Sequence, residues 1–182
     1  MASSPGLRLS AALPGTLHRQ HTAFGGRVSS TLFLSVRRFK SCVYSPKAPD
    51  PVGPYSQAIK AKGFVFVSGQ IGVDPSSMRL VEGGIKAQTK QCLTNVEKVL
   101  QAAGCDWGSV VSTTVLLSDM AHFRSLNEVY SDFFKKPAQH NASRKDTSRD
   151  IAFPSRAAFA VKELPMGALV EITAVAVTAD SE

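Results

Sequence analysis

The alternation of hydrophobic and polar positions predicts a domain that mixes strands and helices. Apolar residues recur at every second position, or form short β-branched runs, in five segments, and they recur at helical spacing in two longer ones. In chain order, the expected elements are strands at 59–61 and 64–68, a helix of about 20 residues that ends at Gly104, a strand at 110–117, a helix between Asp119 and Pro137, and strands at 156–162 and 169–177. This order predicts an α+β fold in which two helices cover one face of a mixed β-sheet.

Two segments lack any such periodicity and are predicted to be loops. Residues 43–56 contain four prolines, which provide no amide hydrogen for a helix or a central strand, so this segment should be extended and stiff. Residues 137–152 are polar and charged, and they form a long connection for a compact domain. We expect this second segment to be an exposed loop.

The positive charge of the chain is concentrated at its N-terminal end. The formal net charge is +7, and residues 1–49 contain seven of the 21 Lys and Arg residues but none of the 14 acidic residues. The other 14 basic residues therefore balance the 14 acidic residues of positions 50–182. Because phosphate binding needs clustered positive charge, a neutral domain argues against nucleic acid as its partner.

Residues 1–39 have the composition of an organellar transit peptide. They are rich in Ser, Ala, Leu and Arg, and arginines are interspersed among apolar residues. The frequency of arginine favours the mitochondrial matrix over a plastid or the cytoplasm, and cleavage near Lys40 would leave a domain of residues 40–182. The alternative is a basic tail that is never cleaved. No apolar run approaches the roughly 18 residues of a membrane span, so we expect no membrane insertion.

The motifs of nucleotide cofactors and of catalytic zinc are missing from the sequence. Beyond the leader there are two histidines, His122 and His140, too few for a conventional histidine-based metal site. The three cysteines have no C-x-x-C spacing, which predicts free thiols. We therefore expect neither a metal nor a cofactor.

Three polar residues lie in apolar or rigid surroundings and are candidates for chemistry. Arg156 begins a strand, and its guanidinium suits a carboxylate ligand. Glu171 lies within an apolar strand, where burial raises the pKa of a carboxyl group toward neutrality. Tyr55 ends the proline-rich segment, so its hydroxyl could orient a substrate or a water. The alternative is that Arg156 and Glu171 pair with each other, or line an outer face of the sheet.

Several segments carry a family resemblance. Two of them lie near the C-terminus: Pro-Ser-Arg-Ala-Ala-Phe-Ala-Val-Lys-Glu-Leu at 154–164 and Val-Glu-Ile at 170–172. Three more lie earlier in the chain, at 48–58, 67–72 and 127–130. In this order, across residues 44–179, they closely resemble the RidA (YjgF) family. The resemblance covers essentially all of the predicted mature domain.

The resemblance implies a chorismate-mutase-like fold that assembles as a homotrimer, with pockets between neighbouring subunits. It implies hydrolysis of reactive 2-imino acids, such as 2-iminobutanoate and 2-iminopropanoate, or of their enamine tautomers, to 2-keto acids and ammonia. Pyridoxal-phosphate-dependent dehydratases release these intermediates, so the family implies a functional link to them. No cofactor is implied for the hydrolysis itself.

The resemblance also implies roles for five residues of this chain. Arg156 would bind the substrate carboxylate, and Glu171 would activate or orient the attacking water. Tyr55 would help to place the water or the substrate. Gly69 would allow a close backbone approach beside the pocket, and Asn127 would add polarity to it.

Two departures from the family pattern affect these expectations. Some members carry a cysteine two positions after the arginine, where this chain has Ala158, so a mechanism here must proceed without that thiol. The connection before Arg156 includes an apparent insertion near 143–152. Two other functions remain open: an RNA-binding or ribonuclease-type translation inhibitor, and a non-catalytic chaperone or small-ligand sensor that uses the same pocket.

Overall fold

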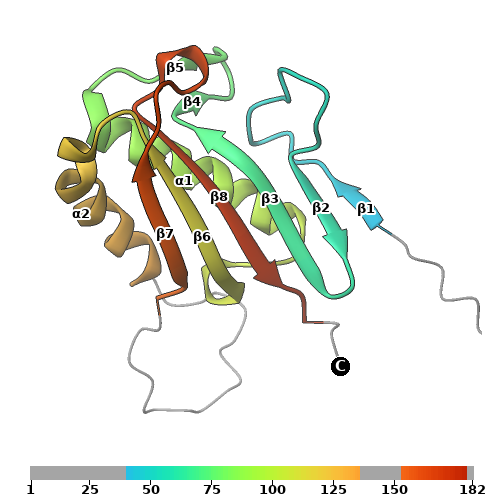
Figure 1. Ribbon diagram of the computed structural model, residues 1–182. Coiled ribbons are helices and arrows are strands. Elements are labelled where there is room, and N and C mark those ends of the chain that lie inside the picture. The colour runs from blue at the N-terminus through green and yellow to red at the C-terminus, as the bar shows by residue number, and fades with distance from the viewer. Residues whose placement is uncertain (1–39, 136–152, 180–182) are drawn as a thin grey trace, which may run out of the picture. The chain divides into compact units, whose positions relative to one another are not determined.

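The computed structural model describes residues 40–135 and 153–179, in which six strands form a mixed sheet in the order β1-β2-β3-β8-β6-β7 (Figure 1). β6 and β7 are parallel, and the other neighbouring strands are antiparallel. The strands of this sheet are β1 (Lys40–Val43), β2 (Ala58–Ala61), β3 (Phe64–Ile71), β6 (Val110–Leu117), β7 (Ser155–Ala160) and β8 (Val170–Val177). A small hairpin of β4 (Val73–Asp74) and β5 (Arg79–Leu80) follows β3. The fold is the predicted α+β class with a mixed sheet.

Two helices, α1 (Gly84–Ala102) and α2 (Phe123–Phe134), lie on the same face of the sheet (Figure 1). α1 ends before Gly104, whose φ of 75° is the left-handed conformation that commonly stops a helix. The two helices bury apolar side chains at helical spacing toward the strands, and they pack against each other. The buried apolar residues are Cys92, Leu93, Val96, Val99 and Leu100 on α1, and Leu126, Tyr130, Phe133 and Phe134 on α2.

The strand β8 shows how the sheet separates its two faces. Every second residue from Val170 to Ala176 is buried, and the intervening positions from Glu171 to Val177 are only partly buried. On the face away from the helices, Phe66 of β3 is paired with Val175, and Phe159 of β7 is paired with Leu116 of β6. About half of each of these two phenylalanine side chains is exposed, so apolar surface remains uncovered on this face.

The structure differs from the sequence-based expectations at three points. β1 was not predicted, because a four-residue edge strand with one buried side chain carries almost no periodicity. No strand was predicted between residue 68 and the first helix, but the short β4–β5 hairpin lies there. The second helix was expected to begin directly after Asp119, but the Asp119 side chain accepts a hydrogen bond from the Ala121 amide and caps a 3₁₀ turn that precedes α2.

Three expectations concern residues outside the described ranges: the transit peptide at 1–39, the loop at 137–152, and the insertion near 143–152. Within the described ranges, none of the helices has the length and apolar character needed to cross a membrane. All three cysteines are free thiols.

Candidate active site

Glu171 projects from β8 on the face of the sheet that the helices leave open. Its neighbours in the ladder are Ile71 on β3 and Leu116 on β6. Burial raises the pKa of the Glu171 carboxyl group above its ordinary value. Within residues 40–135 and 153–179, no hydrogen bond or ion pair joins this carboxylate to another residue. A partly buried carboxylate without a protein partner is suited to accept a proton from a bound water.

Gly69 makes room for this carboxylate. It lies in a β-bulge of β3, where the pairing with β8 shifts between Val67 and Gln70. A Cβ atom at position 69 would lie 2.7 Å from the carboxyl carbon of Glu171, closer than two such carbon atoms can approach. The close approach expected at Gly69 is therefore made by the Glu171 side chain, which packs against the glycine α-carbon.

Polar side chains of α1 support the strand that carries the bulge, and they were not recognised in the sequence. The Cys92 thiol donates a hydrogen bond to the carbonyl oxygen of Gln70 at 2.9 Å. Asn95 Nδ2 donates to the carbonyl oxygens of Ile71 and Val73 at 3.1 and 2.8 Å. Burial raises the pKa of the Cys92 thiol, so it remains protonated and can donate.

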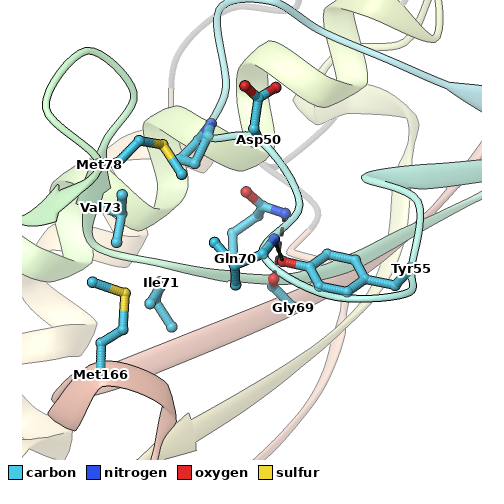
Figure 2. A pocket seen from close by; sticks show the side chains of 10 residues that line it. Asp50, Tyr55, Gly69, Gln70, Ile71, Val73, Met78 and Met166 are labelled. Atoms are coloured by element: carbon cyan, nitrogen blue, oxygen red, sulfur yellow. Dashed lines mark hydrogen bonds between the residues drawn. The ribbon is translucent and has the colours of Figure 1, made fainter.

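Tyr55 is held near Gly69 by the loop that connects β1 to β2. Its hydroxyl accepts a hydrogen bond from the Val52 amide at 3.4 Å, and its own amide donates to the carbonyl oxygen of Gly53 at 2.8 Å. In Figure 2 the hydroxyl is directed toward the chain at Gly69. The tyrosine is 46% exposed, so its ring forms an accessible wall.

Gln57 fixes this loop from within, and it too had no role in the sequence-based interpretation. The side chain is almost fully buried. Its Oε1 accepts a hydrogen bond from the Ser45 amide at 2.6 Å, while its Nε2 donates to the carbonyl oxygens of Ser45 and Pro49 at 3.1 and 2.8 Å. A buried amide that satisfies several backbone groups makes the loop rigid despite its lack of regular structure.

Tyr55, Gly69 and Glu171 line one hollow, which has a volume of about 360 Å³. Its other walls are Val52, Ser68, Ile71, Pro165 and Met166. The hollow thus combines one partly buried carboxylate and one phenol with apolar walls. This is a suitable environment for proton transfer to and from a small organic molecule.

Arg156 lies in a second hollow, of about 430 Å³, together with Asn127. Arg156 Nη1 donates a hydrogen bond to Asn127 Oδ1 at 2.8 Å. The guanidinium carbon stacks 4.8 Å from the ring centre of Tyr130 and 5.4 Å from that of Phe123, both on α2. Tyr130 is itself held by a 2.7 Å hydrogen bond to the Thr113 hydroxyl. These contacts orient the guanidinium and leave its remaining N–H groups available for an anionic ligand.

The predicted site residues therefore form two groups, and a single chain does not bring the groups together. Arg156 pairs with Thr113 of β6 and points to the helix side, whereas Glu171 pairs with Leu116 and faces the open side. Their partners on β6, Thr113 and Leu116, are three residues apart, which is about 10 Å along the strand. No ion pair joins Arg156 to Glu171 within the described residues, so the alternative of such a pair within the chain is wrong.

Comparisons with known proteins identify the family of this chain. The family model described as Endoribonuclease L-PSP, that of the RidA (YjgF) proteins, matches residues 45–178. The chain belongs to the RidA family. The human protein named 2-iminobutanoate/2-iminopropanoate deaminase is 44% identical over 135 residues, which cover 74% of this chain and 88% of the human one.

Solved structures of RidA relatives have the same fold. The chain is similar to a putative endoribonuclease L-PSP from Entamoeba histolytica, with a TM-score of 0.67 and 38% identity over 77% of this chain and 100% of the other. It is also similar to RidA from the Antarctic bacterium Psychrobacter sp. PAMC 21119, with a TM-score of 0.65 and 37% identity over 76% and 99% of the two chains. In residues 40–135 and 153–179, no cluster of three or more His, Cys, Asp or Glu residues could hold a metal ion.

Proposed function

We propose that this protein is a cofactor-independent deaminase that hydrolyses 2-imino acids to 2-keto acids and ammonia. The observation that carries the proposal is the Glu171 carboxylate, which has a raised pKa and lies against Gly69 in the hollow that Tyr55 lines. The name and the 44% identity of the human deaminase support the same substrate class. Its name specifies the imines that correspond to 2-oxobutanoate and pyruvate.

The reaction adds one water across a C=N bond. The imine carbon is already electrophilic, so the protein has to hold the substrate, place a water and move protons. Glu171 takes a proton from the water as the water oxygen bonds to the imine carbon, and it passes this proton to the imine nitrogen, which gives a tetrahedral carbinolamine. Glu171 then takes the hydroxyl proton of this intermediate and passes it to the amino group, which leaves as ammonia while the C=O bond of the keto acid forms. Arg156 binds the substrate carboxylate, and Asn127 orients the guanidinium.

This mechanism requires an assembled site between subunits. The carboxylate and the imine carbon of a 2-imino acid are adjacent atoms, whereas Arg156 and Glu171 lie on opposite faces of the sheet in one chain. The site is therefore formed when Arg156 of one subunit approaches Glu171 of the next, in a cyclic homotrimer. The uncovered apolar face around Phe66 and Phe159 provides surface for such an interface. Sedimentation should give a trimer, and a stable monomer at micromolar concentration would contradict this site.

A coupled assay tests the activity directly. A pyridoxal-phosphate-dependent dehydratase acting on threonine or serine generates the imine in the cuvette, and ammonia release is followed with and without this protein. We expect faster release in its presence, and no acceleration by the Glu171→Gln variant. Equal rates with and without the wild-type protein would refute the proposal. Because such dehydratases release the imine substrate, we propose that they are functional partners of this protein in the cell.

The mitochondrial matrix is the location that we propose for this activity. It is supported by the acid-free, arginine-containing sequence of residues 1–39. A fluorescent reporter fused to residues 1–41 should enter mitochondria, and replacement of its arginines by glutamine should abolish import. A reporter that remains in the cytosol would contradict this location.

Endoribonuclease activity, which the description of the family names, is not favoured here. Residues 50–182 carry equal numbers of basic and acidic residues, so they lack the excess positive charge that phosphate binding needs. The hollow that contains Glu171 is mostly apolar and includes no lysine or arginine. Within a single chain, a polyanion would therefore find no counter-charge among the walls of this hollow.

A further inference from the structure

A small recess adjoins the hollow that contains Glu171, and Figure 2 shows the residues that line the recess. The two cavities share five lining residues: Val52, Tyr55, Gly69, Ile71 and Met166. The volume of the recess is about 40 Å³, room for roughly three atoms of the size of a water oxygen. A substrate held next to Gly69 and Glu171 would have this recess directly at its side. The mechanism above assigns no role to it.

The walls of the recess are apolar and adaptable. Figure 2 shows the side chains of Met78 and Met166 on either side of Val73 and Ile71. Methionine side chains are flexible and polarizable, so they pack well against unbranched chains and against sulfur. The only charged side chain among the ten residues that line the recess is Asp50. An anionic side chain of a substrate would meet this carboxylate without any basic partner.

The two methionines share an unusual backbone conformation. Met78 has a φ of 55° and Met166 a φ of 58°, both in the left-handed region that residues with a Cβ atom rarely adopt. Three residues other than glycine have positive φ in the described ranges, and two of the three are walls of this one recess. Glycine would adopt these conformations without strain, so the local chain geometry does not explain why methionine is present. The side chains themselves must contribute, either to the stability of the turns or to the recess.

We propose that the recess receives the side chain of the 2-imino acid, and that Met78 and Met166 set a preference for uncharged, unbranched side chains of three or four heavy atoms. The inference rests on the proposed deaminase function and adds the specificity of that site. Side chains of the norvaline, norleucine and methionine type fit the length and the apolar walls. Branching next to the imine carbon would make the side chain too wide for a recess of about 40 Å³, and Asp50 would repel carboxylate side chains.

Specificity can be measured with imines made in place from single amino acids. A broad-specificity amino-acid oxidase, with catalase present, converts alanine, norleucine, valine and glutamate to their imines, and the imine that remains is trapped with semicarbazide. We expect kcat/KM of the full-length protein for the norleucine imine to exceed that for the alanine imine by about tenfold or more, as added methylene groups in an apolar pocket require. The valine and glutamate imines should be poorer substrates than the norleucine imine.

Three variants and one control test the role of the recess. Met78→Gly and Met166→Gly remove a wall and suit the observed φ values, so the protein should still fold. Val73→Leu fills the recess from its buried wall. Each should reduce the norleucine-to-alanine ratio by about fourfold or more, because burial of one methylene group changes an equilibrium constant by about that factor. Met120→Ala changes an exposed methionine that lines neither cavity, and it should leave the ratio unchanged.

The outcomes separate this inference from the proposed function. If the wild-type protein hydrolyses the alanine imine but the ratio is the same in all variants, the recess does not bind the side chain, and the deaminase function stands. If no imine is hydrolysed, the proposed function is wrong. In that case, calorimetric measurement of 2-oxohexanoate and pyruvate binding tests whether the recess binds an apolar side chain. Tighter binding of 2-oxohexanoate that is lost in Met78→Gly and Met166→Gly supports it, and equal binding of the two acids overturns it.

Discussion

The Glu171 side chain packs against the α-carbon of Gly69, in the position where any other residue would carry its Cβ atom. The two residues lie on neighbouring strands, β3 and β8, at the bulge that interrupts their pairing. The bulge and the glycine together allow a carboxylate from the middle of an apolar strand to lie along the backbone. The position of the proposed base therefore depends on the absence of one side chain.

Gly69→Ala should remove most of the activity with a smaller effect on folding. The new methyl group would overlap the carboxyl group of Glu171, which must rotate away from its present position. Because a displacement of about 1 Å in a catalytic group can lower the rate a hundredfold, we expect kcat to fall by roughly that factor. Steady-state kinetics on an imine generated in place, together with a thermal melt, measures both effects.

Gly53→Ala is the matched control for this change. A Cβ atom at Gly53 would lie 3.6 Å from the Tyr55 ring, an ordinary van der Waals distance. Its kcat should remain within about threefold of that of the wild-type protein, as for a substitution without a steric conflict. If the two alanine variants lose activity equally, the contact between Gly69 and Glu171 is not what positions the base.

Glu171→Gln should lower kcat about a hundredfold or more while leaving the binding of a 2-keto acid largely intact. The amide has nearly the same shape as the carboxyl group, but it cannot accept the proton of the water. The pH dependence gives a second readout, because burial raises the pKa of Glu171. The acidic limb of kcat/KM in the wild-type protein should therefore lie above the ordinary glutamate pKa of about 4.5, and the variant should lack this limb.

The same pKa shift predicts that Glu171 destabilises the fold at neutral pH. A carboxyl group with a higher pKa in the folded chain binds more protons there than in the unfolded chain, so stability decreases as pH rises from the unfolded pKa through the folded pKa. Glu171→Gln should thus melt at a higher temperature than the wild-type protein at pH 8, with the difference vanishing near pH 4. A lower melting temperature at pH 8 would identify Glu171 as a structural residue.

The sequence was sufficient for those elements whose side chains repeat with the period of the element. The stripe of α1 and the alternation of β8 are of this kind, and the one carboxylate in β8 identified Glu171 as a candidate. The register of the strands, and the face of the sheet on which a given side chain lies, could not be predicted in this way. Whether Arg156 meets Glu171 depends on its pairing with Thr113 in a parallel ladder, which is a relation between distant segments. The burial of Gln57 also depends on such a relation, since its partners lie 8–12 residues away in an irregular loop.

The methionines of the recess could not be predicted for a different reason. A position with a positive φ angle is usually occupied by glycine or asparagine. In the turns at Met78 and Met166, methionine occupies this position instead. Local preference and observed conformation disagree there. Disagreements of this kind gather at functional sites, where other interactions maintain the conformation.

Arg156→Lys should lower kcat/KM for imine hydrolysis by about ten- to a hundredfold. Lysine keeps the charge, but it loses both the planar stacking on Tyr130 and the geometry of the 2.8 Å hydrogen bond to Asn127. A charged hydrogen bond contributes about 1.5–3 kcal/mol, which corresponds to that range. Arg124→Lys changes an exposed arginine on α2, the helix that carries Asn127 and Tyr130, and should have no such effect. Wild-type kinetics of Arg156→Lys would contradict binding of the substrate carboxylate by this guanidinium.

Mixed oligomers test whether one site takes residues from two subunits. Subunits with Arg156→Ala retain Glu171, and subunits with Glu171→Gln retain Arg156, so each variant alone should be nearly inactive. If the site joins Glu171 of one subunit to Arg156 of the next, a cyclic oligomer assembled from equal amounts of both variants contains intact sites. Random assembly makes about one site in four intact, so co-expression should restore about a quarter of the wild-type activity. Mixing the two purified variants without subunit exchange is the control. The absence of recovery in co-expressed oligomers of confirmed mixed composition would show that Arg156 and Glu171 do not act in a shared site.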